Sequence, residues 1–251
     1  MGLGISVASI TAVLAMSVGA APWAITVGDP SRAGPPVSDL VGGLIVTHGD
    51  QVFHTSDSQF LPGTDNQGWW SPTEDNYSAN DNYIVGQHDG DDFRNFFTFD
   101  VSSLSGTAVS ATLRLSCYRP PFPPNASHIY ALSRVETPAR ELNRNKGTSA
   151  DIWQDLGDGG YGAHSVTESD CPSHAAALDL PLNDAAVTDI NAARHWFSIG
   201  GFLTTSPEIT EQFLFGRSSG MGIQALVVQT ESYERRSMGP AGGAPGAPSR
   251  T

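Results

Sequence analysis

The sequence predicts an all-β fold with one or two short helices in the connections between strands. Residues 93–101 alternate apolar and polar side chains, and residues 111–117 resume the alternation in phase after a short Ser/Gly break. Period-two alternation is the pattern of a strand that buries one face. The 251 residues also include 27 glycines, 17 prolines and 39% hydrophobic residues, which suits many turns around an ordinary core.

Further strands are expected on both sides of this central pair, where apolar residues alternate or cluster. They cover residues 44–46, 52–60, 128–135, 197–203, 211–215 and 224–229. Residues 61–82 are predicted to form a long polar loop, because Gly, Pro, Asn, Asp and Ser are frequent in that stretch. Residues 119–127 should be an extended connection, since their prolines have no backbone N–H to pair in a sheet.

Two short helices are expected in the connections, over residues 150–156 and 184–193. Thr148 or Ser149 can cap the first helix, and Asn183 can cap the second, which has an aspartate in its first turn. A capping side chain accepts a hydrogen bond from a backbone N–H that has no partner within the helix, and a carboxylate there suits the positive end of the helix dipole.

Residues 1–20 are predicted to be a secretory signal peptide. The apolar run over residues 5–18 is too short to span a membrane comfortably, and small residues suited to a peptidase follow it. An uncleaved anchor is the alternative, because no Lys or Arg precedes the run. We expect no transmembrane segment in the mature chain, which comprises a linker (21–40), one β domain (41–232) and a disordered Gly/Pro/Ala-rich tail (233–251).

The formal net charge of −13 makes nucleic acid an unfavourable partner, because an acidic surface repels a phosphate backbone. The two cysteines, Cys117 and Cys171, could form one disulfide across a long loop in an oxidising compartment. Two unpaired buried thiols are the alternative, because Cys117 lies on the inward phase of its strand. Together with the apolar N-terminal run, the cysteines favour a secreted or extracellular protein.

An acidic loop precedes the central strand and is the candidate metal site. Asp89, Asp91 and Asp92 lie close together, with further Asp and Asn residues shortly before them. Ca²⁺ takes six to eight oxygen ligands, which carboxylates and loop carbonyls supply, so Ca²⁺ is the candidate cofactor. The alternative is a solvated hairpin turn with Asp89-Gly90 at its tip. We expect Arg94 to pin this loop through ion pairs with the neighbouring aspartates.

Trp69, Trp70 and Tyr77 are the candidate ligand-binding residues. They lie in the predicted polar loop, where exposed aromatic faces could stack on the C–H faces of sugar rings. The alternative is that they fold back over one end of the core, where burial of an aromatic side chain is worth a few kcal/mol.

Two glycine motifs occur in a sequence context that does not suit their usual chemistry. Residues 157–162 match G-x-G-x-x-G, but a dinucleotide-binding turn needs a strand before it and a helix after it. Residues 216–220 match G-x-S-x-G, but a strand pattern follows them instead of the helix that would expose Ser218 as a nucleophile. We therefore predict no catalytic residue.

Three stretches resemble the signature of exported bacterial β-sandwich proteins of unassigned function, a group that often carries a C-terminal Pro-Glu-Pro sorting tag. They are residues 82–86, 93–101 and 109–115. The similarity continues through residues 152–157, 182–193, 197–201 and 212–216, so that it covers roughly residues 82–230. The first half also resembles jelly-roll surface modules with an Arg-Phe-x-x-Phe-Asp core strand, which include carbohydrate-binding modules.

This resemblance implies a single jelly-roll-like β-sandwich and supplies no catalytic residue. The chain departs from the tagged proteins after Glu234, where neither the Pro-Glu-Pro element nor an apolar helix follows. That departure favours a freely released protein.

The function we expect is that of an exported non-catalytic module, which binds a glycan, the extracellular matrix or a cell-envelope component, or serves structurally at the cell exterior. Ligand contacts would lie on the loops at one end of the sandwich. The alternative is a secreted hydrolase acting on polysaccharide or ester. A hydrolase requires two carboxylates roughly 5–10 Å apart across a cleft, or a serine and a histidine that converge.

Overall fold

The structure, a computed structural model, describes most of the chain from residue 37 onward. The described residues are 37–41, 44–117, 127–173, 176–204, 212–215 and 224–235. They belong to one compact unit, residues 33–251. The predicted signal peptide, most of the predicted linker and the predicted tail beyond residue 235 lie outside the described residues.

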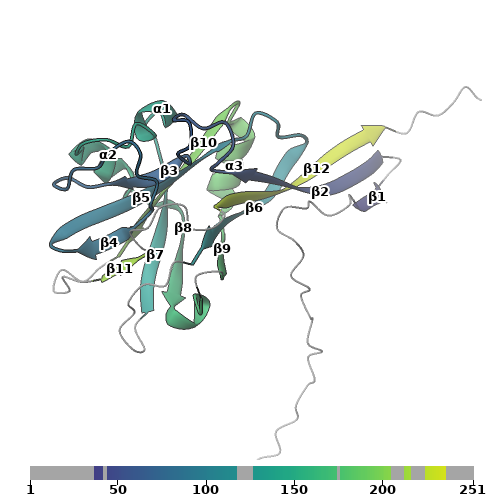
Figure 1. The fold of residues 1–251 in the computed structure, drawn as a ribbon. Helices are drawn as coiled ribbons and strands as arrows, with labels where there is room; N and C mark the ends of the chain where they lie inside the picture. The colour runs from purple at the N-terminus through teal and green to yellow at the C-terminus, as the bar shows by residue number, and fades with distance from the viewer. Residues whose placement is uncertain are drawn as a thin grey trace, which may run out of the picture. The chain divides into compact units, whose positions relative to one another are not determined.

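The fold is mostly β and consists of two packed sheets, which confirms the predicted fold class (Figure 1). The first sheet has, in spatial order, β1 (Val37–Val41), β2 (Leu44–His54), β12 (Ala225–Arg235), β6 (Thr107–Ser116) and β9 (Ala177–Pro181). The second has β11 (Gln212–Leu214), β4 (Val85–His88), β5 (Asp91–Asp100), β10 (Trp196–Leu203), β7 (Ser127–Arg134) and β8 (Gly160–Thr167). A further strand, β3 (Gln67–Trp70), also pairs with β5.

The strand order is that of a jelly roll. Four antiparallel pairs are nested along the chain: β2 with β12, β5 with β10, β6 with β9, and β7 with β8. The pairs alternate between the two sheets, which gives the orders β2-β12-β6-β9 and β5-β10-β7-β8. Two interleaved Greek keys of this kind define the double-sheet jelly roll.

The main core lies between the two sheets and is filled by the alternation seen in the sequence. Phe97 and Phe99 of β5 are fully buried in one cluster with Leu113 and Leu115 of β6. The opposite face of β5 is also covered, because Phe96 belongs to a second cluster. That cluster contains Trp70, Phe96, Leu142, Ile152 and Leu156.

Within the described residues, three α-helices lie in the connections: α1 (Ala139–Leu142), α2 (Ala150–Asp155) and α3 (Asp184–Ala192). The capped helices predicted from the sequence are α2 and α3. Ser149 accepts a hydrogen bond from the Ile152 N–H, and Asn183 accepts hydrogen bonds from two N–H groups of the first turn of α3. The additional helix, α1, lies with α2 over the outer face of the second sheet (Figure 1).

Several strands differ from the prediction. Strand β1 begins inside the predicted linker, and β2 runs without a break from Leu44 to His54. Because β2 pairs with β12 along its whole length, the strand continues through the polar residues around Gly49, where the sequence pattern predicted no strand. Strand β3 lies inside the predicted loop 61–82, and β9 has only five residues, too few to show a clear period.

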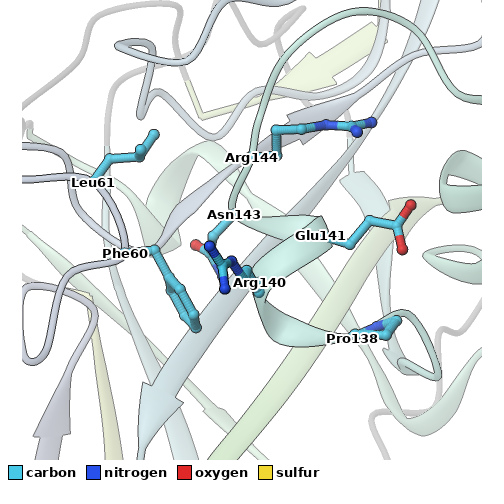
Figure 2. A pocket seen from close by; sticks show the side chains of 7 residues that line it. All are labelled: Phe60, Leu61, Pro138, Arg140, Glu141, Asn143 and Arg144. Carbon is cyan, nitrogen blue, oxygen red and sulfur yellow. The ribbon is translucent and has the colours of Figure 1, made fainter.

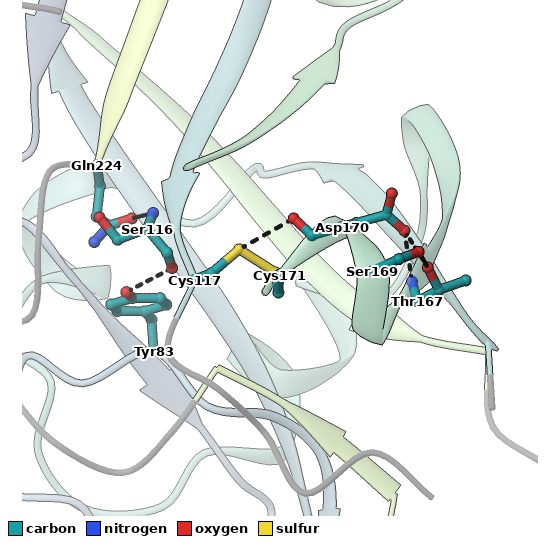
Figure 3. Close-up of a disulfide and its surroundings, with 8 residues drawn as sticks. All are labelled: Tyr83, Ser116, Cys117, Thr167, Ser169, Asp170, Cys171 and Gln224. Carbon is teal, nitrogen blue, oxygen red and sulfur yellow. Dashed lines mark hydrogen bonds between the residues drawn. A yellow bond between two sulfur atoms is a disulfide. The ribbon is translucent and has the colours of Figure 1, made fainter. Parts of the chain in front are cut away.

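The two cysteines form a disulfide, as predicted (Figure 3). Cys117 directly follows β6, and Cys171 follows the short 3-10 helix η1 (Glu168–Asp170), with 5.3 Å between their Cα atoms. Both residues are buried, and Thr167 and Asp170 form a capping box that orders the turn before Cys171. The disulfide therefore links the end of β6 to the β8–β9 connection.

No helix in the described part of the chain is long and apolar enough to cross a membrane.

Removal of the disulfide is expected to destabilise the fold strongly. For a sequence separation of 54, the loop-closure entropy predicts a loss of about 4 kcal/mol in the free energy of unfolding for Cys117→Ala combined with Cys171→Ala. Urea denaturation of the double variant and of the parent protein, with and without dithiothreitol, measures this loss. A loss below about 1 kcal/mol, or a parent protein insensitive to the reductant, would contradict the prediction.

Stability is expected to fall as the pH is lowered below neutrality. Burial lowers the pKa of His128 on β7 and of His164 on β8. At His164 a backbone hydrogen bond with Pro181 opposes this lowering of the pKa. A folded-state pKa below the unfolded value contributes stability above about pH 6.5, and this contribution is lost as the pH falls through the folded pKa. Denaturation midpoints between about pH 7.5 and 5 should fall with pH, and the combination of His128→Gln and His164→Gln should flatten that slope. An unchanged slope in the double variant would show that other groups cause it.

Candidate functional site

The three candidate sugar-binding aromatics do not form one exposed surface. Trp69 and Trp70 are 5% and 0% exposed, whereas Tyr77 is 65% exposed. Strand β3 places the two indoles on opposite faces of the sheet: Trp69 packs edge-on against Phe93, and Trp70 donates its Nε1–H to the Leu142 carbonyl at 3.2 Å. The two tryptophans are therefore buried, each in a small cluster beside the main core, whereas Tyr77 does not fold back as the alternative expected.

A buried network of asparagines holds the segment between β3 and β4. Asn76 donates to the Asn145 side chain at 2.7 Å and accepts from Asn80 at 2.8 Å, and Asn80 in turn accepts from Asn82 at 2.6 Å. Asn145 lies directly on Gly68, where a Cβ atom would come within 2.6 Å of its side-chain amide. The predicted polar loop is thus a tightly packed part of the fold, which explains why its tryptophans are covered.

The acidic loop is the hairpin turn between β4 and β5. Asp89 and Gly90 have φ values of 53° and 88°, the left-handed conformation that a two-residue type I′ turn requires. Asp91 accepts a hydrogen bond from Thr73, and burial raises the pKa of Asp92 while the charge of Arg94 opposes that rise. No three His, Cys, Asp or Glu side chains of the described residues are grouped so that they could hold a metal ion. The structure therefore shows the turn and does not bring the three aspartates together as Ca²⁺ ligands.

Arg94 anchors helix α2 to the second sheet. Its guanidinium lies 3.5 Å from the centre of the Trp153 ring and donates to the carbonyl oxygens of Trp153 and Gln154, at 2.8 and 3.1 Å. Burial lowers the pKa of Arg94, and the charges of Asp92 and Asp158 oppose that effect. The expectation that Arg94 pins the acidic loop by ion pairs is therefore corrected: its contacts hold the end of α2.

A groove lies between the segment after β2 and helix α1, and we call it the Phe60 groove. Its volume is about 580 Å³, and its lining residues are Phe60, Leu61, Pro138, Arg140, Glu141, Asn143 and Arg144 (Figure 2). Asn143 fixes this wall to the sheet beneath, because its Nδ2 donates to Thr98 Oγ1 of β5 at 3.0 Å. The sequence prediction missed the groove, since α1 is too short to show a helical period.

An aromatic row continues from the groove along the start of β10. The Phe60 ring packs on Trp196 with ring centres 4.5 Å apart, and His195 stacks on Trp196 at the same distance with only 14° between the planes. The Phe60 backbone N–H donates to Asn66 Oδ1 at 3.0 Å. Phe60 is therefore held from two sides while it also lines the groove.

A carboxylate, Asp100, lies at the end of β5 beside this row. Ser58 Oγ donates to Asp100 Oδ2 at 2.6 Å, and His195 Nε2 lies 3.6 Å from the same oxygen. Burial alone would raise the pKa of Asp100, but the hydrogen bonds from Ser102 and Ser58 and the charge of His195 together hold it below its ordinary value.

Ser58, Asp100 and His195 are the residue types of a hydrolytic triad, but their order does not suit that chemistry. Ser58 and His195 both contact the carboxylate, so Asp100 lies between them. A serine nucleophile needs the histidine as its direct base, with the carboxylate behind the histidine. The cluster therefore provides an ionised hydrogen-bond acceptor and no activated serine.

Gly157→Ala is expected to loosen α2 because a Cβ atom there would lie 1.8 Å from Arg94 Nη1. The displaced guanidinium would lose its carbonyl contacts, and overpacking of this kind costs about 1–3 kcal/mol in the free energy of unfolding. Chemical denaturation measures the change. The control is Gly49→Ala, where an added Cβ atom meets nothing within 4 Å. Equal stability of the two variants would contradict the assigned role of Arg94.

Comparisons with known proteins assign no function to this chain. No protein-family model matches the chain, and no curated protein matches it either. Ser218 of the G-x-S-x-G motif lies outside the described residues. A jelly roll is compatible with many activities, so any function must be argued from the Phe60 groove and its surroundings.

Proposed function

We propose that this chain is an exported, non-catalytic β-sandwich module that binds a glycan of the extracellular matrix or cell envelope through the Phe60 groove. The observation that carries the proposal is the juxtaposition of a supported aromatic ring, Phe60, with planar polar side chains along one groove. Sugar rings have apolar C–H faces and many hydroxyls, so they suit a site that combines an aromatic surface with hydrogen-bonding groups.

The groove also has the rigidity that a binding site requires. Phe60 is held by Trp196 and Asn66, and Asn143 is held by Thr98, so that these side chains lose little conformational freedom when a ligand binds. We therefore propose Phe60, Arg140 and Asn143 as the ligand contacts, in place of Trp69 and Trp70, which are buried, and of Tyr77, which lies outside the groove.

Export is supported by several features of the chain. A disulfide is typical of oxidising compartments, and the apolar run near the N-terminus is typical of a secretory signal peptide. The resemblance to exported bacterial β-sandwich proteins points to the same location. Signal-peptide cleavage, release from the cell and membership of that group remain part of the proposal.

The rival function, a secreted hydrolase, has less support. Of the seven side chains that line the groove, Glu141 is the single carboxylate. A glycosidase acts through a pair of carboxylates, and an esterase through a serine with a histidine base. Ser58 contacts Asp100 instead of a histidine, so neither arrangement is formed by the residues around the groove.

Binding of the full chain to an array of extracellular polysaccharides tests the proposal, followed by titration calorimetry of the glycans that bind. Phe60→Ala is expected to weaken binding at least about tenfold, because burial of a phenylalanine side chain is worth about 1.5–3 kcal/mol. Release of reducing ends from the same glycans, measured in parallel, should stay at the background rate.

The control for this experiment is Tyr77→Ala, which removes an exposed aromatic ring outside the groove. It should bind as the parent protein does. The proposal fails if no glycan binds, if Phe60→Ala binds normally, or if the chain cleaves the polysaccharide.

A further inference from the structure

We propose that the Phe60 groove is selective for glycans that carry carboxylates, that is, for short oligomers of uronic acids whose carboxylate enters the groove, because the acidic remainder of the surface disfavours long polyuronates as it disfavours nucleic acid. This inference rests on the proposed glycan-binding function and adds the chemical class of the ligand. The inference is derived from the two arginines that line the groove, which form no ion pair with a carboxylate among the described residues.

Two of the seven lining side chains are arginines, Arg140 and Arg144, in a chain with 13 basic and 26 acidic residues. Neither guanidinium forms an ion pair with a carboxylate among the described residues. Arg114 differs in this respect, because it makes two hydrogen bonds to Asp179 at 2.6 and 2.8 Å. Among the described residues, neither arginine of the groove is therefore neutralised by direct contact with a carboxylate.

The end of the groove at Phe60 has the arrangement that a uronate ring needs. Figure 2 shows Arg140 and Asn143 lying toward Phe60, whereas Glu141 and Arg144 point away from it, so that Arg140 is the cation at this end. A guanidinium binds a carboxylate through two parallel hydrogen bonds, which a lysine cannot do. The apolar face of the same sugar ring can then pack on Phe60.

Asn143 adds an acceptor for a sugar hydroxyl. Its Nδ2 already donates twice within the fold, to Thr98 Oγ1 at 3.0 Å and to the Ala139 carbonyl at 2.8 Å. These bonds fix the amide so that its Oδ1 is the atom left for a ligand. A uronate would therefore meet a cation, a hydroxyl acceptor and an aromatic face within one groove, and a neutral sugar would leave the cation unused.

Calorimetric titration of the full chain with oligogalacturonate and with its methyl ester tests this selectivity, because the two ligands differ in charge and little else. We expect the acid to bind at least about tenfold more tightly, the value of one charge-assisted contact. Its affinity should fall as NaCl is raised from about 0.05 to 0.5 M, because exposed charges are screened. Arg140→Gln should abolish the difference between acid and ester.

The matched control is Lys146→Gln, which removes the same charge nearby but outside the groove lining and should leave the preference intact. Equal binding of acid and ester, both sensitive to Phe60→Ala, would overturn the uronate inference and leave the proposed function standing. Binding of neutral glycans alone, with neither galacturonan form bound, would overturn it as well. Failure of every glycan in both assays would instead remove the proposed function, and the inference with it.

Discussion

The burial of both faces of β5 is the constraint on which the rest of the structure depends. Its inner face supplies Phe97 and Phe99 to the core between the sheets, and its outer face carries Phe96, which water would otherwise contact. Covering Phe96 requires apolar side chains from outside the sandwich, and Leu142 and Ile152 of the two connecting helices provide them. The helical layer is therefore a consequence of the apolar residue Phe96 on the outer face of β5. Helix α1 of that layer also forms one wall of the Phe60 groove.

The jelly-roll topology decides which segments meet at this layer. Because β5 pairs with β10, Trp196 lies opposite Asp100, and the segment after β2 brings Phe60 onto the Trp196 ring. Nested pairs of this kind join residues that are far apart in sequence, so the groove is assembled from two connections, the segment after β2 and the segment around α1. Hydrogen bonds from Asn143 and to Asn66 then fix its walls, which gives a preorganised surface in place of a mobile loop.

Local sequence patterns predicted the parts of the fold that depend on neighbours along the chain. Alternation over 93–101 identified β5 and its buried face, and capping residues Ser149 and Asn183 identified α2 and α3. The disulfide was also predictable, since two cysteines in a chain with an export signature favour one, although the inward strand position of Cys117 had left two buried thiols as the alternative. Helices as short as α1 and strands as short as β9 were missed, because their stability comes from the elements that they contact.

The sequence by itself determined the all-β class, the main strands and the two capped helices, because side-chain period and capping are properties of short segments. Only the tertiary structure decided which aromatics are exposed: Trp69 and Trp70 are covered by distant residues such as Phe93 and Leu142, while Phe60 reaches a groove. The tertiary structure also shows that Arg94 contacts the end of α2 and not, as the sequence predicted, the acidic loop. Exposure and pairing depend on contacts across the fold, and a local pattern does not specify which distant segment supplies them.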